Sequence, residues 1–264
     1  MYSSNSVPSL VNCVINANSA ILGAGIYFDA SSAFSNLTNT TIVRNTASTN
    51  GGALYSANTS AKIINSILWE NSPQEVYNDA TSSPTITYSD VYGGYTGAGN
   101  IDASPAFVNI AAQNFHLTAA SACIDAGSNA APYLPLQDKD GNARINDGTV
   151  DMGAYEYSSK ILLLNGGRFT VTVDWETPTG STGQGTAVAL TSDSGYFWFF
   201  EGTNIELLVK IKDGRAVNGH YWFFYGAMTD VEYTITVTDT VSSTVKTYHG
   251  IQHVQTSGND INAF

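Results

Sequence analysis

A seven-residue segment with asparagine at both ends occurs three times in the first third of the chain, and this repeat limits the fold more than any other feature. The copies are NCVINAN, NTTIVRN and NSILWEN, which begin at Asn12, Asn39 and Asn65, so that their starts lie 27 and 26 residues apart. No copy shows the 3.6-residue periodicity of a helix. A period of this length built from short strands predicts a coil of stacked strands.

Such a coil places equivalent residues of successive turns above one another, about 4.8 Å apart. The fourth residue of each copy, Ile15, Ile42 or Leu68, then forms an interior column. The paired asparagines fall at turns, where their amides can form hydrogen bonds along a ladder. Arg44 and Glu70 share a position in the repeat and are predicted to form a surface ion pair.

The second half of the chain repeats a different pattern, rich in aromatic residues. GYFWFF, from Gly195, returns as GHYWFF, from Gly219, with Trp198 and Trp222 aligned. An alternating strand follows each copy, so each unit predicts a hairpin, and six or more strands favour an Ig-like β-sandwich. Alternate aromatic residues would then fill its core. A sugar-stacking platform and a membrane contact are the alternatives for the same run.

The fold class expected is therefore all-β, with a short parallel β-helix over residues 1–158 and a β-sandwich over residues 159–264. Ten Lys and Arg against 22 Asp and Glu give a net charge of -12, which argues against nucleic acid as a partner. No apolar run is long enough to span a membrane. Cys13 and Cys123 are expected in different layers of the fold as free thiols, with a disulfide between them as the alternative.

Several motifs carry a resemblance to known families. GAGIY, GGALY, IVRN and LWEN resemble the repeats of right-handed parallel β-helices in polymorphic outer-membrane and autotransporter-like surface proteins, with Ile or Leu in place of the commoner Phe. NFHLTAASACIDAGS and DKDGNARINDGTVDMGAYEY resemble the closing segment of bacterial secreted proteins often called choice-of-anchor Q. That resemblance covers residues 7–157. The last domain resembles uncharacterised C-terminal modules of bacterial secreted proteins.

These resemblances imply an extracellular or cell-surface protein and name no substrate. At the N-terminus, residues 1–10 contain a proline and no amphipathic pattern, so they make a poor cap for the first turn of a coil. Either the chain is a fragment of a longer coil or another molecule covers this turn, and we expect self-association through the N-terminal β-helix edge, for instance head to tail into filaments. Surface glycans are the other partner class considered.

One candidate metal site precedes the domain boundary. Asp138, Asp140 and Asn142 alternate in DKDGN, as at the start of a calcium loop, although the pattern lacks the closing Glu of an EF-hand. The alternative is a turn capped by its own side chains, with Arg144 neutralising one acid. His116 is expected to be a half-buried strand residue and not a ligand. No other cofactor is predicted.

A candidate contact strip follows from strand alternation. Val14, Thr41 and Ile67, with Val43 and Trp69, would point outward from the coil and are unusually apolar for a solvent-facing column. Reversed strand parity would bury them instead. No catalytic residue is predicted, because the few acids before residue 100 do not stack in the pairs that glycoside hydrolysis needs.

The function expected is that of an extracellular structural or adhesive surface protein, which could extend to self-assembly into filaments or a matrix. The alternative is a carbohydrate-binding or polysaccharide-degrading protein.

Overall fold

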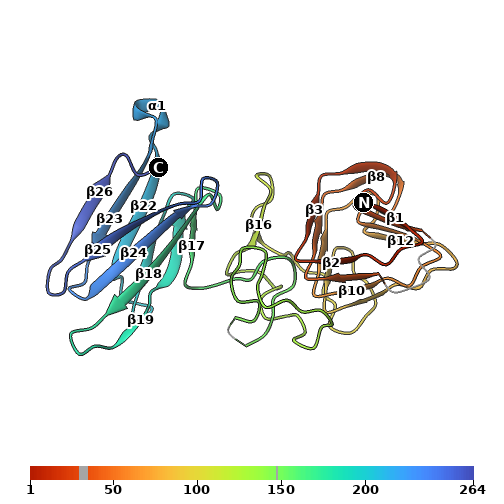
Figure 1. Ribbon diagram of the computed structural model, residues 1–264, viewed down its shortest axis with the longest axis horizontal. Helices are drawn as coiled ribbons and strands as arrows, with labels where there is room; N and C mark the ends of the chain where they lie inside the picture. Colours follow the sequence, from red (N-terminus) through yellow and green to blue (C-terminus); the bar gives the residue numbers. More distant parts are fainter. Residues whose placement is uncertain (30–34, 147) are drawn as a thin grey trace. The chain divides into compact units, whose positions relative to one another are not determined.

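The chain folds into two compact units of β-structure, Met1–Tyr157 and Ser158–Phe264 (Figure 1). The computed structural model describes residues 1–29, 35–146 and 148–264. The first unit is a parallel β-helix and the second contains two antiparallel sheets, so the predicted all-β fold class is confirmed. The observed division falls one residue before the predicted boundary.

Successive turns of the first unit stack their strands in three parallel four-stranded sheets. The first sheet contains β1 (Tyr2–Ser4), β5 (Ile26–Asp29), β9 (Leu54–Ala57) and β12 (Val76–Asn78). The second contains β2 (Ser9–Val11), β6 (Asn36–Thr38), β10 (Lys62–Ile64) and β13 (Thr85–Thr87). The third contains β3 (Val14–Asn16), β7 (Thr41–Val43), β11 (Ile67–Trp69) and β14 (Asp90–Val91). A smaller parallel sheet pairs β4 (Ser19–Leu22) with β8 (Thr46–Asn50).

The interior column predicted from the repeat is present in the third sheet. Ile15, Ile42, Leu68 and Val91 are aligned in register, and all four belong to the coil's core or pack against it. Full burial of each such side chain stabilises the fold by roughly 1.5–3 kcal/mol. Stacking therefore turns a repeat that cannot bury its apolar face alone into a continuous core.

The asparagines that open the three repeat copies occupy sharp turns. Asn12, Asn39 and Asn65 have φ angles of 52°, 51° and 52°, in the left-handed region that asparagine tolerates better than most residues. Their side chains also hold residues far along the chain: Asn39 Nδ2 donates to the carbonyl of Asp151, at 3.1 Å. Asparagine at this position thus both shapes the turn and anchors a distant segment.

The asparagines that close the three copies form the predicted ladder. Asn18 Nδ2 donates to Asn45 Oδ1 at 2.8 Å, and Asn45 Nδ2 donates to Asn71 Oδ1 at 2.8 Å. Asn71 Nδ2 then donates to Glu75 Oε2 at 2.6 Å. We call these four residues the asparagine ladder. It satisfies polar groups that would otherwise be costly to bury inside the coil.

Residues 100–157, here called the closing segment, cover one side of the coil. They contain an antiparallel pair, β15 (Phe107–Asn109) and β16 (Asn114–Leu117), and otherwise few strands. Leu117, Cys123 and Met152 form a buried cluster with Ile67 of the third sheet. Both cysteines are free, as expected. His116 is half-buried in β16, which confirms its interpretation as a strand residue.

The second unit is built from two sheets of five strands each. One contains β17 (Leu162–Leu164), β18 (Phe169–Glu176), β24 (Glu232–Asp239) and β25 (Thr244–Gly250), with β19 (Thr182–Gln184) paired to β18. The other has the order β20 (Thr186–Thr191), β21 (Ser194–Trp198), β22 (Leu207–Asp213), β23 (Tyr221–Ala227) and β26 (Ser257–Asp260). A single helical turn, α1 (Arg215–Asn218), joins β22 to β23.

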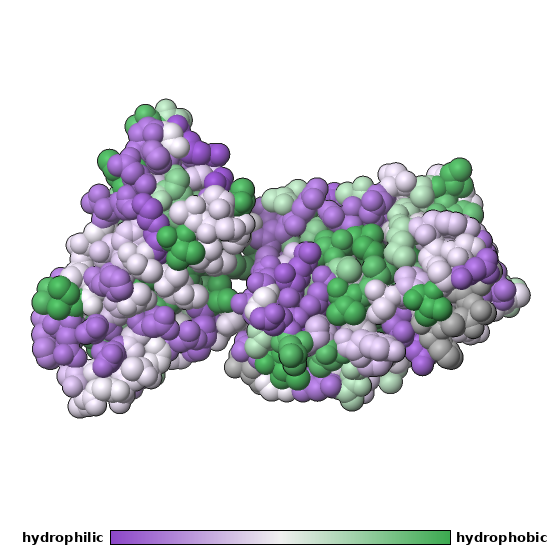
Figure 2. Space-filling view, viewed as in Figure 1, coloured by the Kyte–Doolittle hydropathy of each residue, from purple (hydrophilic) through white to green (hydrophobic). Residues whose placement is uncertain are grey.

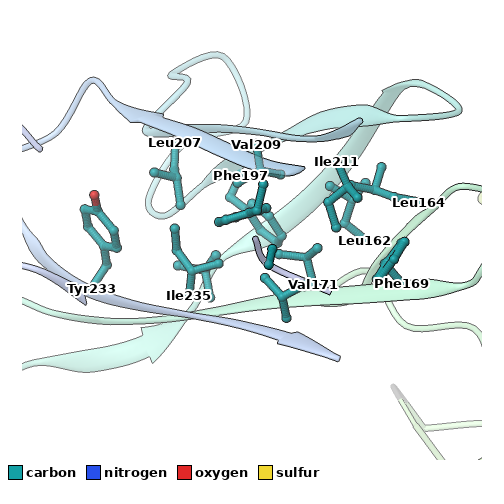
Figure 3. Close-up of a cluster of buried hydrophobic side chains, with 14 of the residues drawn as sticks. Leu162, Leu164, Phe169, Val171, Phe197, Leu207, Val209, Ile211, Tyr233 and Ile235 are labelled. Atoms are coloured by element: carbon teal, nitrogen blue, oxygen red, sulfur yellow. The ribbon is translucent and has the colours of Figure 1, made fainter. Parts of the chain in front are cut away.

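Alternate residues of the aromatic run fill the core of this sandwich, as Figure 3 shows for Phe197 with its aliphatic neighbours. Phe197 and Phe199 are buried, and the aligned Tyr221 and Phe223 are buried as well. The prediction that alternate aromatic residues fill the core is therefore confirmed. The two tryptophans occupy the other set of positions and are half-buried.

Candidate binding surfaces

A buried arginine organises the end of the closing segment. The Arg144 side chain is fully buried, and its guanidinium donates to the carbonyls of Gly153 and Ala154 at 2.9 and 2.8 Å. It also lies 3.2 Å from Glu156 Oε1. Burial, followed by the charge of Asp151, raises the pKa of Glu156 to about 9. The two backbone carbonyls and the Glu156 carboxyl group that Arg144 contacts all belong to the closing segment, which is the arrangement of a structural centre.

The candidate calcium residues form a hydrogen-bonded turn. Asp138 Oδ1 accepts the backbone N–H groups of Asp140 and Asn142, and its Oδ2 accepts that of Glu156. The Asp140 carboxylate contacts His116 Nε2 instead of joining Asp138. Across residues 1–29, 35–146 and 148–264, no group of three or more His, Cys, Asp or Glu could hold a metal ion. These contacts favour the capped turn. Arg144, however, pairs with Glu156 and not with an acid of the DKDGN turn.

The contact strip is not an exposed surface. Thr41, Val43 and Ile67 are buried, while Val14 and Trp69 are half-buried. Strand alternation does point them away from the coil interior, but the closing segment packs on Thr41, Ile67 and Trp69. 

Two contacts show how closely the closing segment packs on the third sheet. The N–H of Ala154 donates to Thr41 Oγ1 at 3.0 Å, and a Cβ atom on Gly153 would come within 2.7 Å of the Ile67 side chain. The predicted strip is therefore part of an internal interface.

A row of tyrosines lies on the outer face of the first sheet. Tyr2, Tyr27, Tyr55 and Tyr77 are aligned in register, and neighbouring rings have centroids 5.2, 4.7 and 5.0 Å apart. We call this row the tyrosine ladder. The alternate residues of β5 point inward and are fully buried, so the strand pattern fixes the rings on the outside. Tyr2 is 63% exposed and the other three are half-buried.

Carboxylates lie beside the tyrosine ladder. Asp29 Oδ2 accepts the hydroxyl of Tyr2 at 3.0 Å. Asp79 accepts the backbone N–H groups of Asn58 and Thr81, and hydrogen bonds, that of Ser82 first, lower its pKa to about 2. The surface therefore combines aromatic rings with carboxyl oxygen acceptors.

Sequence reasoning found only part of this row. Tyr27 and Tyr55 follow the glycine turns of the repeat, but Tyr2 and Tyr77 lie outside the repeat copies, in the first and last turns. The spacings between the four tyrosines are 25, 28 and 22 residues, because the turns differ in length. Aligning the turns on their strands and not on a fixed period would have found all four.

Comparison of the chain with protein-family models, with curated proteins and with solved structures finds no match. The resemblance to secreted β-helix proteins therefore depends on the sequence motifs alone. Within the part of the chain that the structure describes, no helix is long and apolar enough to cross a membrane.

Proposed function

We propose that the chain is an extracellular structural or adhesive surface protein that acts by binding, and that the tyrosine ladder is its contact surface for glycans. The observation that supports this most directly is the outward-facing row of four tyrosine rings, held about one strand spacing apart. Its extracellular location is supported by the sequence resemblance.

The chemistry of the ladder suits a sugar chain. The apolar C–H face of a sugar ring packs on an aromatic ring, and sugar hydroxyls donate to carboxylates such as Asp29 and Asp79. Parallel strands hold the rings in place, so little conformational freedom is lost on binding. The net charge of -12 favours neutral over anionic glycans.

The buried acids of the first unit support binding over catalysis. Glu75, Asp90, Asp151 and Glu156 all accept hydrogen bonds from backbone or side-chain groups of the fold. Burial raises the pKa of each, to about 7, 6, 6 and 9 respectively. Each of these acids thus helps to hold the coil and its closing segment together.

A glycan array tests the proposal. The intact chain should bind one class of neutral glycan, and the double variant Tyr27→Ser, Tyr55→Ser should lose at least tenfold in affinity. Tyr133→Ser, which removes a tyrosine that is 68% exposed outside the ladder, is the matched control and should bind normally. Equal binding by a folded double variant would refute the ladder's role. Release of reducing ends or unsaturated sugars would refute the absence of catalysis.

A second candidate function is self-association at the first turn of the coil. Within the described residues, no strand pairs with the outer side of β1, β2 or β3. Leu10 and Ile15 of this layer are only partly buried, and Figure 2 shows an apolar area framed by the first-turn strands. Unpaired strand edges with an apolar interior favour stacking of further strands.

The other end of the coil is covered by its own chain. Val91 N–H donates to the carbonyl of Ile101 at 2.9 Å, and Tyr88 N–H donates to that of Ala98 at 2.8 Å. Head-to-tail filaments would have to displace these residues, so a pair of copies meeting at their first turns is the form proposed. Analytical ultracentrifugation over a concentration series should detect dimers. A monomer at every concentration would refute this candidate.

A further inference from the structure

A groove crosses the outer face of the sheet that contains the aromatic run. It has a volume of about 520 Å³ and is lined by residues of all five strands, from β20 to β26. Apolar side chains of Leu190, Leu208 and Phe224 line it together with polar ones. The polar side chains are those of Ser194, Lys210, Ser257 and Asn259.

Strand alternation explains why these side chains face outward. Val209 and Phe223 belong to the sandwich core, so their neighbours Leu208 and Phe224 point to the opposite face. Leu208 lies opposite Gly226 in the register of β22 and β23. A Cβ atom at Gly226 would meet nothing within 4 Å, so the groove deepens where this side chain is missing.

The position of the groove limits what can bind there. The three inner strands, β21 to β23, are each paired on both sides, so the groove floor offers side chains for recognition. An extended peptide that adds a strand needs an unpaired edge instead. An aromatic ring and aliphatic carbons flanked by hydroxyl, amide and ammonium groups match a saccharide, which has apolar ring faces and polar edges.

The charge of the lining favours a neutral ligand. Lys210 Nζ, the cation of the groove lining, lies 3.4 Å from Asp193 Oδ2, which offsets its charge. The chain as a whole carries a net charge of -12 and repels anionic polymers. The acyl chain of a fatty acid or phospholipid would offer no hydrogen-bond partner to the four polar groups of the lining.

We propose that this groove binds a neutral oligosaccharide that lies across the strands, in contact with Phe224 and Leu208. The site lies in the second unit and does not depend on the tyrosine ladder. The polar side chains at Ser194, Ser257 and Asn259 are placed to exchange hydrogen bonds with sugar hydroxyls.

The test fills the groove without removing any contact of the fold. Gly226 has no left-handed φ, so Gly226→Val is compatible with the backbone, and valine suits a strand. Thr170→Val, on the outer face of the other sheet, is the matched control. Phe224→Thr removes the aromatic ring and keeps a β-branched residue. The melting temperature of each variant checks folding.

Isothermal titration of the intact chain with cellohexaose, xylohexaose, laminarihexaose and chitohexaose measures binding. At least one should bind, Gly226→Val and Phe224→Thr should each lower its affinity tenfold or more, and Thr170→Val should not change it. If a folded Gly226→Val variant binds as the parent does, or if no hexasaccharide binds, the groove proposal is overturned. Binding of phospholipid vesicles or of an extended peptide at this groove instead would also overturn it.

The ladder variant separates this proposal from the proposed function. Loss of binding in Tyr27→Ser, Tyr55→Ser but not in Gly226→Val supports the ladder and overturns the groove. The reverse result supports the groove and overturns the ladder.

Discussion

Glu75 makes the stability of the coil depend on pH in an unusual direction. It is 5% exposed and ends the asparagine ladder, accepting the N–H of Asn71 at Oε1 and its Nδ2 at Oε2, at 2.9 and 2.6 Å. Burial raises its pKa from 4.5 to about 7, with smaller contributions from the charges of Asp90 and Glu70. The hydrogen bonds from Asn71 oppose this shift but do not cancel it.

The sign follows from comparing the folded and unfolded chains. Between pH 4.5 and pH 7 the unfolded chain has lost the Glu75 proton while the folded chain retains it. The folded state therefore binds more protons, and the free energy of unfolding falls as the pH rises. A difference between 4.5 and about 7, at ~1.4 kcal/mol per pH unit, corresponds to about 3 kcal/mol. The loss is complete above pH 7 and absent below pH 4.5.

Glu75→Gln removes the titration and keeps the size of the side chain. Relative to the parent, this variant should gain about 3 kcal/mol between pH 4.5 and pH 8. Glu70→Gln is the matched control, because it removes the same charge from a half-exposed site in the same turn and should show no comparable gain. Hydrogen exchange of coil peptides, measured by mass spectrometry and corrected for intrinsic rates, reports the free energy. Parallel pH profiles for the parent and Glu75→Gln would refute the reasoning.

Three further outcomes are expected. Arg144→Met should destabilise the first unit by about 2–6 kcal/mol, because it leaves the carbonyls of Gly153 and Ala154 without their donor at ~1–3 kcal/mol each, and unchanged hydrogen exchange in the closing segment would contradict this. Phe223→Ala should lower the free energy of unfolding of the second unit by about 3–5 kcal/mol, and Trp222→Ala, at a half-buried residue, by roughly 1–2 kcal/mol. Equal losses of stability in urea unfolding would contradict the assignment of Phe223 to the inner face of the sheet and Trp222 to the outer face. Millimolar calcium should leave the melting temperature unchanged, since both Asp138 oxygens already accept N–H groups, and a rise that a chelator reverses would show that the turn binds the ion.

Much of the fold could be predicted because the repeat brings together residues of adjacent turns. The column of Ile15, Ile42 and Leu68 follows from the period alone, since stacked strands place equivalent residues above one another. The same logic predicts the surface pair of Arg44 and Glu70, whose charged atoms lie 3.8 Å apart. In both cases the residues that meet occupy the same place in successive copies.

The contact strip could not be assessed in the same way, because the residues that cover it come from a distant part of the chain. Alternation correctly directs Thr41 and Ile67 away from the coil interior, but only the folded closing segment shows that Gly153 and Ala154 lie on them. Those contacts join residues more than 80 positions apart, and no pattern within the repeat encodes them. Likewise, no local pattern reveals the empty space above Gly226.

The asparagine ladder has a direction, and that direction distinguishes the two ends of the coil. Each side-chain amide donates toward the next turn, from Asn18 to Asn45, from Asn45 to Asn71 and from Asn71 to Glu75. Both carboxyl oxygens of Glu75 accept hydrogen bonds from Asn71, so Glu75 ends the series where the chain leaves the repeat. Asn18 is exposed at the other end. A layer that extends the ladder at this end must supply a hydrogen-bond donor to the side-chain oxygen of Asn18. This donor is the most specific requirement on any partner that stacks against the first turn.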